Sequence, residues 1–299
     1  MVCSLATFAQ TKDAEKQESW YFKLGGSYFV QTAATEFPTV SGRDPLSKTY
    51  VGNSLVSEES VTGSFGEGFR SGLTAGYRFS KRVGVEFGVN YYSSKDKTMA
   101  QTVTDQPITS SGAYSFKSVG QITAWDLAPA IVMFLGEAHG FEPYTKVGVL
   151  VPFHGDLEIT SDAYAPIAFD QNTGAPIAFG NVHSVDKVKP NPTVGFTAAL
   201  GSSYKLGEKI SLFAELEYRN FTVHGKTKET TAFTVNGVDR LSTRTTSQVH
   251  TNYQDKLDIN SNNSATNPNG VDTSKPTDEL SSYVGISGLG LTVGLKYSL

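Results

Sequence analysis

Cysteine is almost absent from this chain, and charged residues are scarce. Cys3 is the one cysteine among 299 residues, so the sequence excludes an internal disulfide and a zinc site built from thiolates. Charged side chains make up 18% of the residues, compared with about 25% in typical soluble domains. The net charge of −4 also argues against a nucleic-acid partner, because such a partner selects a basic surface.

Long apolar runs are missing as well. The longest is LAPAIVMFL, residues 127–135, which is far shorter than the roughly 20 residues that a membrane-spanning helix needs. The chain has no His-x-x-His or similar metal-binding spacing and no glycine-rich phosphate loop, so the sequence predicts no metal and no other cofactor. If the chain crosses a membrane, it must do so with strands.

The end of the chain alternates between two kinds of side chain. Large apolar residues stand at every second position, and small or polar residues lie between them. The apolar positions are Leu289, Leu291, Val293, Leu295, Tyr297 and Leu299, and the others are Gly290, Thr292, Gly294, Lys296 and Ser298. Successive side chains of a strand point to opposite faces, so this segment predicts a strand with one apolar and one polar face. About 9–11 such residues are enough to cross a bilayer.

Seven earlier segments repeat this alternation, and their connections are long and short in turn. The segments are residues 20–30, 68–79, 83–91, 119–134, 142–153, 194–206 and 210–221. Long polar connections cover residues 31–67, 95–114, 155–192 and 222–280, and tight turns join the other pairs. A membrane barrel has this asymmetry, because one rim carries short periplasmic turns and the other carries extracellular loops. A β-sandwich could also contain eight alternating strands, but it does not need a long loop at every second connection. The sequence therefore predicts an all-β fold, an eight-stranded antiparallel up-and-down transmembrane β-barrel with long extracellular loops, over residues 20–299.

Charged residues of both signs fall on the predicted inner face. They are Arg70, Arg78, Glu86, Asp126, Lys146, Glu215, Glu217, Arg219 and Lys296. An eight-stranded barrel is only wide enough for its own side chains, and buried charges must be paired or hydrated. We therefore predict a polar plug of ion pairs rather than an open pore. Arg78 stands next to a turn, and we expect it at a water-exposed rim instead.

Several stretches carry a family resemblance. They are the terminal strand, GLTAGYRFSKRVGVEFGVNYY, WDLAPAIVMF, PYTKVGVLVPF and SLFAELEYR. Together they resemble the small bacterial outer-membrane β-barrel proteins of the OmpA, OmpX and opacity-protein type, over residues 20–299. The resemblance implies residence in the outer membrane of a Gram-negative bacterium, contact with outer-membrane lipid, and a monomer. It also implies that the barrel-assembly machinery reads Leu291, Val293, Leu295, Tyr297 and Leu299 as an insertion signal. The family usually ends in Phe, whereas this chain ends in Leu299.

The first residues, MVCSLATFA, resemble the tail of a secretory signal peptide. We expect residues 1–9 to be a remnant of that signal and residues 10–19 to be a periplasmic lead-in. Two hairpins are predicted inside the long connections. The tetrapeptide PIAF occurs at residues 166–169 and again at 176–179, and Asn236-Gly237 favours a tight two-residue turn.

The resemblance is specific for architecture and says little about task. We expect a non-catalytic protein with a structural or surface-interaction role through its long loops, and no extracellular ligand is indicated. One alternative is a small pore or transporter for a small solute. A second is an outer-membrane enzyme that modifies lipid, for which His154 with Asp156 is the best candidate pair, although such pairs are more often incidental.

Overall fold

The computed structural model describes residues 19–299 apart from residues 41, 53, 106–113 and 192. The predicted signal remnant, residues 1–9, and nearly all of the lead-in lie outside the described residues. The fold is all-β: the described residues form nineteen strands, one short 3-10 turn and the four-residue helix α1 (Thr246–Val249). None of the described helices has the length and apolar character to cross a membrane.

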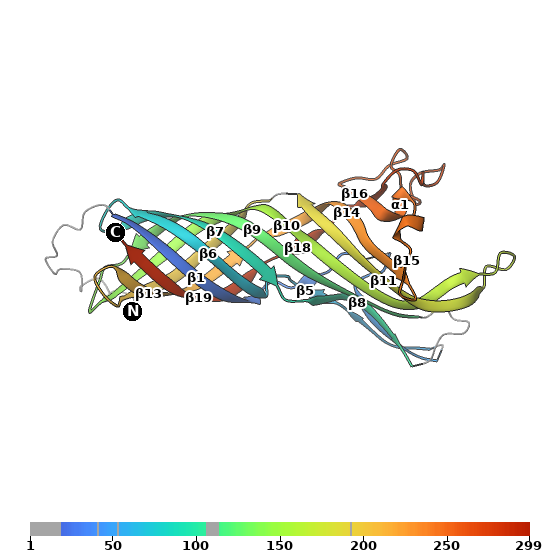
Figure 1. Ribbon diagram of the computed structural model, residues 1–299, viewed down its shortest axis with the longest axis horizontal. Helices are drawn as coiled ribbons and strands as arrows, with labels where there is room; N and C mark the ends of the chain where they lie inside the picture. The colour runs from blue at the N-terminus through green and yellow to red at the C-terminus, as the bar shows by residue number, and fades with distance from the viewer. Residues whose placement is uncertain (1–18, 41, 53, 106–113, 192) are drawn as a thin grey trace, which may run out of the picture.

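Eight strands form a ring of antiparallel pairs, which we call the strand ring. They are β1 (Ser19–Gln31), β6 (Gly68–Arg78), β7 (Val83–Ser94), β9 (Ser115–Phe134), β10 (Phe141–Phe169), β12 (Gly195–Lys205), β13 (Ile210–Asn220) and β19 (Gly288–Ser298). Each pairs with the next in this order, and β19 pairs with β1, so the pairing returns to its start. Figure 1 shows these strands tilted around a tube.

Alternation along the ring strands sorts apolar residues to the outside. On β19, Leu291, Val293 and Leu295 are 58%, 52% and 51% exposed, so neither a second sheet nor a helix covers them. The intervening Thr292 and Lys296 are buried. The other ring strands carry exposed residues of the same kind, such as Leu24 on β1 and Leu200 on β12.

Short turns gather at one end of the strand ring, the turn end. They are residues 79–82, 135–140 and 206–209. The N–H of Leu299 donates a hydrogen bond to the carbonyl of Trp20 over 3.1 Å, so the end of the chain lies beside the start of β1 at this end (Figure 1).

The long connections contain strands that the sequence analysis assigned to loops. Strands β9 and β10 continue past the ring, and the added strands are β3 (Leu46–Val51), β4 (Ser54–Ser60), β8 (Lys97–Thr104), β11 (Pro176–Asn191) and β14 (Thr222–Val235). We call this part the extension; it occupies the right half of Figure 1. The prediction of loops for residues 31–67, 95–114, 155–192 and 222–280 was therefore wrong for much of their length. The outward positions of these strands lie in water and carry charged residues such as Glu158 and Lys187, so the segments resemble polar loops in sequence.

Smaller elements complete the extension. They are β2 (Thr35–Glu36), β5 (Thr62–Gly63), β15 (Val238–Asp239), η1 (Leu241–Thr243), β16 (His250–Gln254), β17 (Thr277–Leu280) and β18 (Tyr283–Gly285). Both predicted hairpins are confirmed. Pro166 pairs with Phe179 across the projecting β10–β11 hairpin, and Asn236 and Gly237, with φ values of 51° and 77°, turn β14 into β15.

A bulge in β10 moves the apolar side of that strand from outside to inside. Pro152 lies opposite Asp126 and His154 opposite Trp125, so Phe153 is one extra residue. A shift of one residue exchanges the two faces of a strand. Val149, before the bulge, is exposed, whereas Leu157, after it, is buried.

The interior consequently has two parts of opposite character. Inside the strand ring charged and polar side chains predominate, beside a small apolar cluster of Tyr21, Val132, Phe134 and Tyr144. Inside the extension it is an apolar core made by Phe37, Val40, Phe65, Tyr92, Met99, Ile122, Leu150, Leu157, Ile159, Val188, Phe221, Val284 and Ile286. This core was not predicted, because many of its residues, such as Phe65, Leu157 and Val188, were assigned to loops.

Candidate functional site

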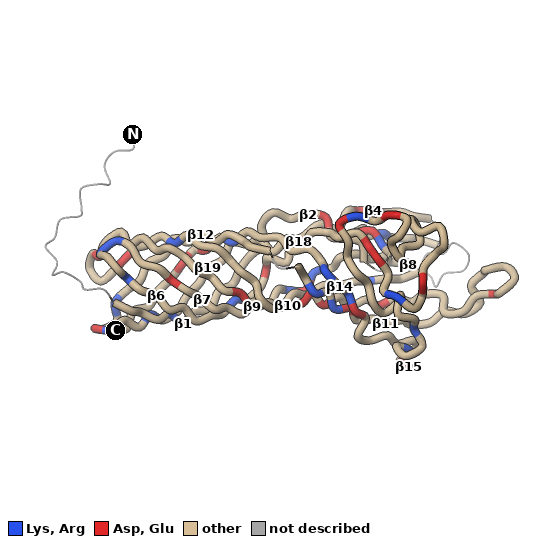
Figure 2. Tube along the Cα trace, turned by 90° about the horizontal axis from the view of Figure 1, so that it is seen from above, with Lys and Arg blue, Asp and Glu red and all other residues tan. Residues whose placement is uncertain are grey.

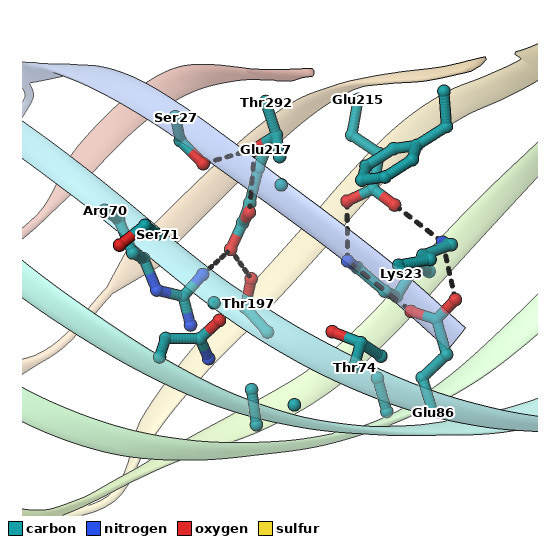
Figure 3. Close-up of a pocket in the computed structure, with 18 residues that line it drawn as sticks. Lys23, Ser27, Arg70, Ser71, Thr74, Glu86, Thr197, Glu215, Glu217 and Thr292 are labelled. Carbon is teal, nitrogen blue, oxygen red and sulfur yellow. Dashed lines mark hydrogen bonds and ion pairs between the residues drawn. The ribbon is translucent and has the colours of Figure 1, made fainter. Parts of the chain in front are cut away.

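Inside the strand ring, charged residues form three clusters stacked along its axis. The middle cluster joins Lys23 to Glu86 and Glu215 (Figure 3). Lys146 also contacts Glu215. The Lys23 Nζ atom lies 2.5 Å from Glu86 Oε1 and 2.9 Å from Glu215 Oε1. The hydroxyl of Tyr144 donates a hydrogen bond to Glu215 over 2.8 Å. All of these side chains are buried or nearly so, so their charges are compensated within the ring.

The second cluster lies farther from the turn end. The Arg70 guanidinium spans two acids, with 2.7 Å from its Nη2 to Asp126 and 2.7 Å from its Nη1 to Glu217. Asn90 donates a hydrogen bond to Asp126 over 2.9 Å, and Thr197 donates one to Glu217 over 3.0 Å. Each acid thus has a cation and a neutral donor, as a buried carboxylate requires.

The third cluster lies next to the turns and corrects one prediction. Arg78 pairs with Glu142 over 2.5 Å, and Lys296 approaches the other oxygen of Glu142 over 3.4 Å. We expected Arg78 to be exposed at the rim, but it is 7% exposed. Its guanidinium lies over the Phe134 ring and donates hydrogen bonds to the carbonyls of Ser80 and Lys81. The tight turn folds its backbone back over the arginine and excludes water from it.

Arg219 caps the plug on the side of the extension and has a different environment. Its guanidinium carbon lies 3.7 Å from the centre of the Tyr92 ring and 4.2 Å from that of Phe29. It donates a hydrogen bond to the carbonyl of Gly66 over 3.3 Å. Its Nε has no hydrogen-bond partner among the described residues. Aromatic faces, rather than a carboxylate in direct contact, therefore surround this charge.

These clusters leave little free space in the ring. The cavity among them has a volume of about 50 Å³, which is room for about one or two water molecules. Gly76 and Gly201 are needed here, because a side chain at either position would collide with the ring of Tyr21 or Tyr144. The arrangement can hold charge and exclude bulk water, but it does not form an open path.

Sequence reasoning missed three members of the plug. Lys23, Glu142 and Tyr21 are buried and interact with the predicted residues. The alternation of side chains could have identified Lys23 as an inward residue, because it lies between the outward Phe22 and Leu24. The predicted residues lie in six of the eight ring strands, along which Figure 2 shows charges of both signs. Arg70 and Arg78 are in β6, Glu86 in β7, Asp126 in β9, Lys146 in β10, Glu215, Glu217 and Arg219 in β13, and Lys296 in β19.

A larger apolar pocket lies where the ring meets the extension. Its volume is about 430 Å³. Its apolar lining includes Ile122, Ala124, Leu157, Val188, Phe221, Val223, Val284 and Ile286, and its polar lining includes His154, Asp156, Lys189, Asn191 and His224. The imidazole of His224 lies 3.0 Å from the Ser281 hydroxyl and 3.4 Å from the Asn191 amide.

The wall of strands is interrupted beside this pocket. Strand β10 pairs with β12 as far as Leu150 and with β11 only from Leu157 onward. In the described part of the chain, residues 151–156 have no partner in register on that side. Pro152 lies on the β10 side of this gap and Pro190 on the β11 side, and proline has no N–H to donate to a ladder.

A comparison with family models decides what kind of protein this is. The model described as outer membrane protein beta-barrel domain matches residues 1–239. The chain belongs to this family. Outer membranes enclose Gram-negative bacteria, so this barrel protein resides in the outer membrane of such a cell.

Two solved structures are similar to this barrel protein. OprG from Pseudomonas aeruginosa is 13% identical, with 95% of this chain and 97% of that chain covered and a TM-score of 0.43. Ail, the attachment invasion locus protein of Yersinia pestis, was solved in complex with the heparin analogue sucrose octasulfate; it is 9% identical, with 94% and 97% covered and a TM-score of 0.30. A search of the curated proteins found no match.

Two histidines of the barrel protein, His154 and His183, have an aspartate nearby in the sequence or in space. His154 and Asp156 both line the apolar pocket, but no hydrogen bond joins them in the described structure. His183 lies 2.7 Å from Asp162 on the outer surface of the extension, where both side chains are exposed. No group of three His, Cys, Asp or Glu side chains suited to a metal ion occurs in the described part of the chain.

A further charged group stands at the rim where the ring meets the extension. Glu67 lies 2.5 Å from Lys97 and 3.2 Å from Lys95, and it accepts a hydrogen bond from Tyr28 over 3.0 Å. The hydrogen bond from Lys97 is the main reason that the pKa of Glu67 falls to about 2. Glu67 therefore stays ionised in mild acid and ties three segments together.

Proposed function

We propose that this protein is an eight-stranded, up-and-down transmembrane barrel that holds a folded β-extension above the outer membrane for surface interaction, without catalysis. The observation that carries this proposal is that two strands of the ring continue without a break into the extension. Strands β9 and β10 run through both the ring and the extension, so the extension is a rigid outgrowth of the barrel wall rather than a set of loops. A rigid outgrowth presents a fixed surface, and this suits recognition or mechanical support.

The character of the outer surface supports this orientation. Exposed residues on the ring strands are apolar, such as Val147 on β10 and Ile131 on β9. On the extension, outward positions of the same wall carry ion pairs, such as Glu158 with Lys187. Hydrocarbon and water sort side chains in this way, so the lipid band covers the ring and ends where the extension begins.

We further propose that outer-membrane lipid and the barrel-assembly machinery are the partners of this barrel, and that the barrel is a monomer. The side chains of Leu291, Val293, Leu295 and Tyr297 on β19, and of Leu299 directly after it, are all exposed, so an assembly factor can contact them during insertion. No extracellular ligand is assigned to the extension.

Two measurements test the proposal. A folded sample in detergent should migrate faster on a gel when unheated than when boiled, and equal mobility would contradict a closed barrel. Protease or antibody added to intact cells should reach residues 222–280, because this segment belongs to the extension. Protection of that segment on intact cells, together with access after lysis, would reverse the orientation.

The plug argues against a pore through the barrel. Ion pairs between Lys23, Glu86 and Glu215 cross the interior, and the remaining cavity is about 50 Å³. We expect no steady conductance in planar bilayers, and a steady conductance would favour a small pore instead.

The alternative of a lipid-modifying enzyme has a separate test. Lipid A from cells that express the wild type and from cells that express His154→Ala should be identical to that of cells without the protein. A modification that disappears in His154→Ala would establish catalysis.

A further inference from the structure

The apolar pocket and the interruption of the wall lie at the same place, and their coincidence suggests a ligand. The gap beside β10 spans residues 151–156, and the pocket lining includes Pro152, Phe153, His154 and Asp156 from that segment. We propose that the pocket binds a single-chain amphiphile with an anionic head group, such as a fatty acid, whose acyl chain enters through this gap in the wall.

The depth of the pocket fits an acyl chain. Residues of the extension core, including Ile122, Val188, Phe221 and Ile286, form its inner side. A volume of about 430 Å³ lies within the range of roughly 300–1,000 Å³ that small-molecule pockets occupy. Burial of a chain against these residues removes apolar surface from water, which is the main source of its affinity.

The mouth fits a carboxylate. Lys189 is exposed on the outer side of β11 and lies in no ion pair among the described residues. The side chains of Asn191 and His224 stand beside it as hydrogen-bonding groups. Asp156 is the one acid in the described lining, and it lies opposite Thr123 in register, on the other side of the gap from Lys189. Charge and hydrogen-bond donors thus meet at the β11–β14 side of the mouth.

The plug determines how the ligand is held. Arg219 with Phe29 and Tyr92 closes the interior toward the turn end, and the polar clusters lie beyond it. An acyl chain that enters the gap has no apolar path onward, so the pocket is a dead-end binding site. The position of the mouth at the edge of the lipid band rests on the orientation proposed above.

Binding can be measured with 11-(dansylamino)undecanoic acid and the full chain in phosphatidylcholine nanodiscs. We expect a saturable rise in dansyl fluorescence that unlabelled laurate reverses. Val223→Trp fills the pocket and should weaken binding by about tenfold or more. Val235→Trp is the matched control, because this half-buried valine lies on the same strand outside the pocket, and it should change the affinity by less than about twofold.

Two further variants separate tail from head. Lys189→Met should weaken binding of the acid several-fold but leave the methyl ester of the probe unaffected. In a Cys3→Ser background, laurate should slow the alkylation of Val223→Cys and leave that of Val235→Cys unchanged, which keeps the test open if a tryptophan variant fails to fold. The gel-mobility assay verifies folding separately, so a folded barrel without binding overturns this inference alone.

The source of the acyl chain is tested by its route of delivery. The dansyl acid is offered from water, and a phospholipid with a dansyl group on one acyl chain is built into the nanodisc. A saturable, Val223-dependent signal from the acid alone indicates a free amphiphile, and one from both indicates that membrane lipid also enters. A signal that grows without saturation, or that is equal in Val223→Trp and Val235→Trp, would overturn the proposal.

Discussion

Lys23 on β1 lies 2.9 Å from Glu215 on β13, although 192 residues separate them in the chain. Strand β19 lies between β1 and β13 in the order of pairing, so this ion pair crosses the inside of the ring. Such pairs connect strands that share no backbone hydrogen bonds. They fix the cross-section of the ring as well as neutralise its charges.

Removal of Lys23 should therefore be strongly destabilising. Lys23→Met leaves Glu86 and Glu215 with Lys146 as their remaining cation, and breaking a buried pair in this way costs about 3–5 kcal/mol. The added substitution Glu86→Gln removes the excess charge and should recover part of the loss. The free energy of unfolding by denaturant, measured in detergent micelles, checks both variants.

Lys205→Met provides the control for that experiment. Lys205 pairs with Glu137 over 2.6 Å at the turn end, where both side chains are partly exposed. Exposed pairs contribute about 0–1 kcal/mol. If Lys23→Met is no more destabilising than Lys205→Met, the plug does not stabilise the ring.

Arg219 and Arg70 should respond differently to the same substitution. Arg70→Met strands two acids, Asp126 and Glu217, and should cost about 3–5 kcal/mol of unfolding free energy. Arg219→Met removes a charge that is held mainly by aromatic faces, for which the loss is about 2 kcal/mol or less, and methionine packs well against rings. In the same denaturant assay, Arg70→Met should therefore lower the free energy of unfolding clearly more than Arg219→Met does. Equal losses would show that Arg219 belongs to the ion-pair network.

The ring was largely predictable from sequence because lipid and a polar interior impose opposite demands on neighbouring residues. Glu215 and Glu217 alternate with the outward Leu216 and Leu212, and this pattern identifies both the strand and its faces. The position of Lys23 was available by the same reasoning. Its partners were not, because alternation gives the face of a residue but not its height relative to a strand elsewhere in the chain.

The extension was not predictable in the same way. Leu157 and Ile159 continue the odd-numbered apolar positions of Val147 and Val149, so the sequence shows no change at Phe153. The bulge reverses the faces there, and these residues become core instead of lipid contact. The apolar pocket depends on that reversal and on a gap between strands, so only three-dimensional structure places its lining together.

Stability at the rim should depend on pH through Glu67. Its pKa in the folded protein, about 2, lies below the ordinary value of about 4.3, so its ionised form stabilises the fold. This contribution is complete above about pH 4.3 and is lost as the pH falls toward about 2. Glu67→Gln should lower the temperature of the gel-mobility transition at pH 7, and the difference from wild type should shrink between pH 4 and pH 2. A difference that stays constant over this range would show that the carboxylate charge is not involved.

The extent of the lipid band can be tested with two arginine substitutions at apolar sites that are both more than half exposed. Val293 on β19 is 52% exposed, and Ile177 near the tip of the β10–β11 hairpin is 66% exposed. If lipid covers Val293, Val293→Arg should cost about 2–4 kcal/mol, as arginine does near the middle of a bilayer. Ile177→Arg should change stability by less than about 0.5 kcal/mol, as surface substitutions usually do in water. The measurement is the free energy of unfolding of both variants in lipid bilayers. Similar small effects at both sites would mean that Val293 faces water and that the ring does not span the membrane.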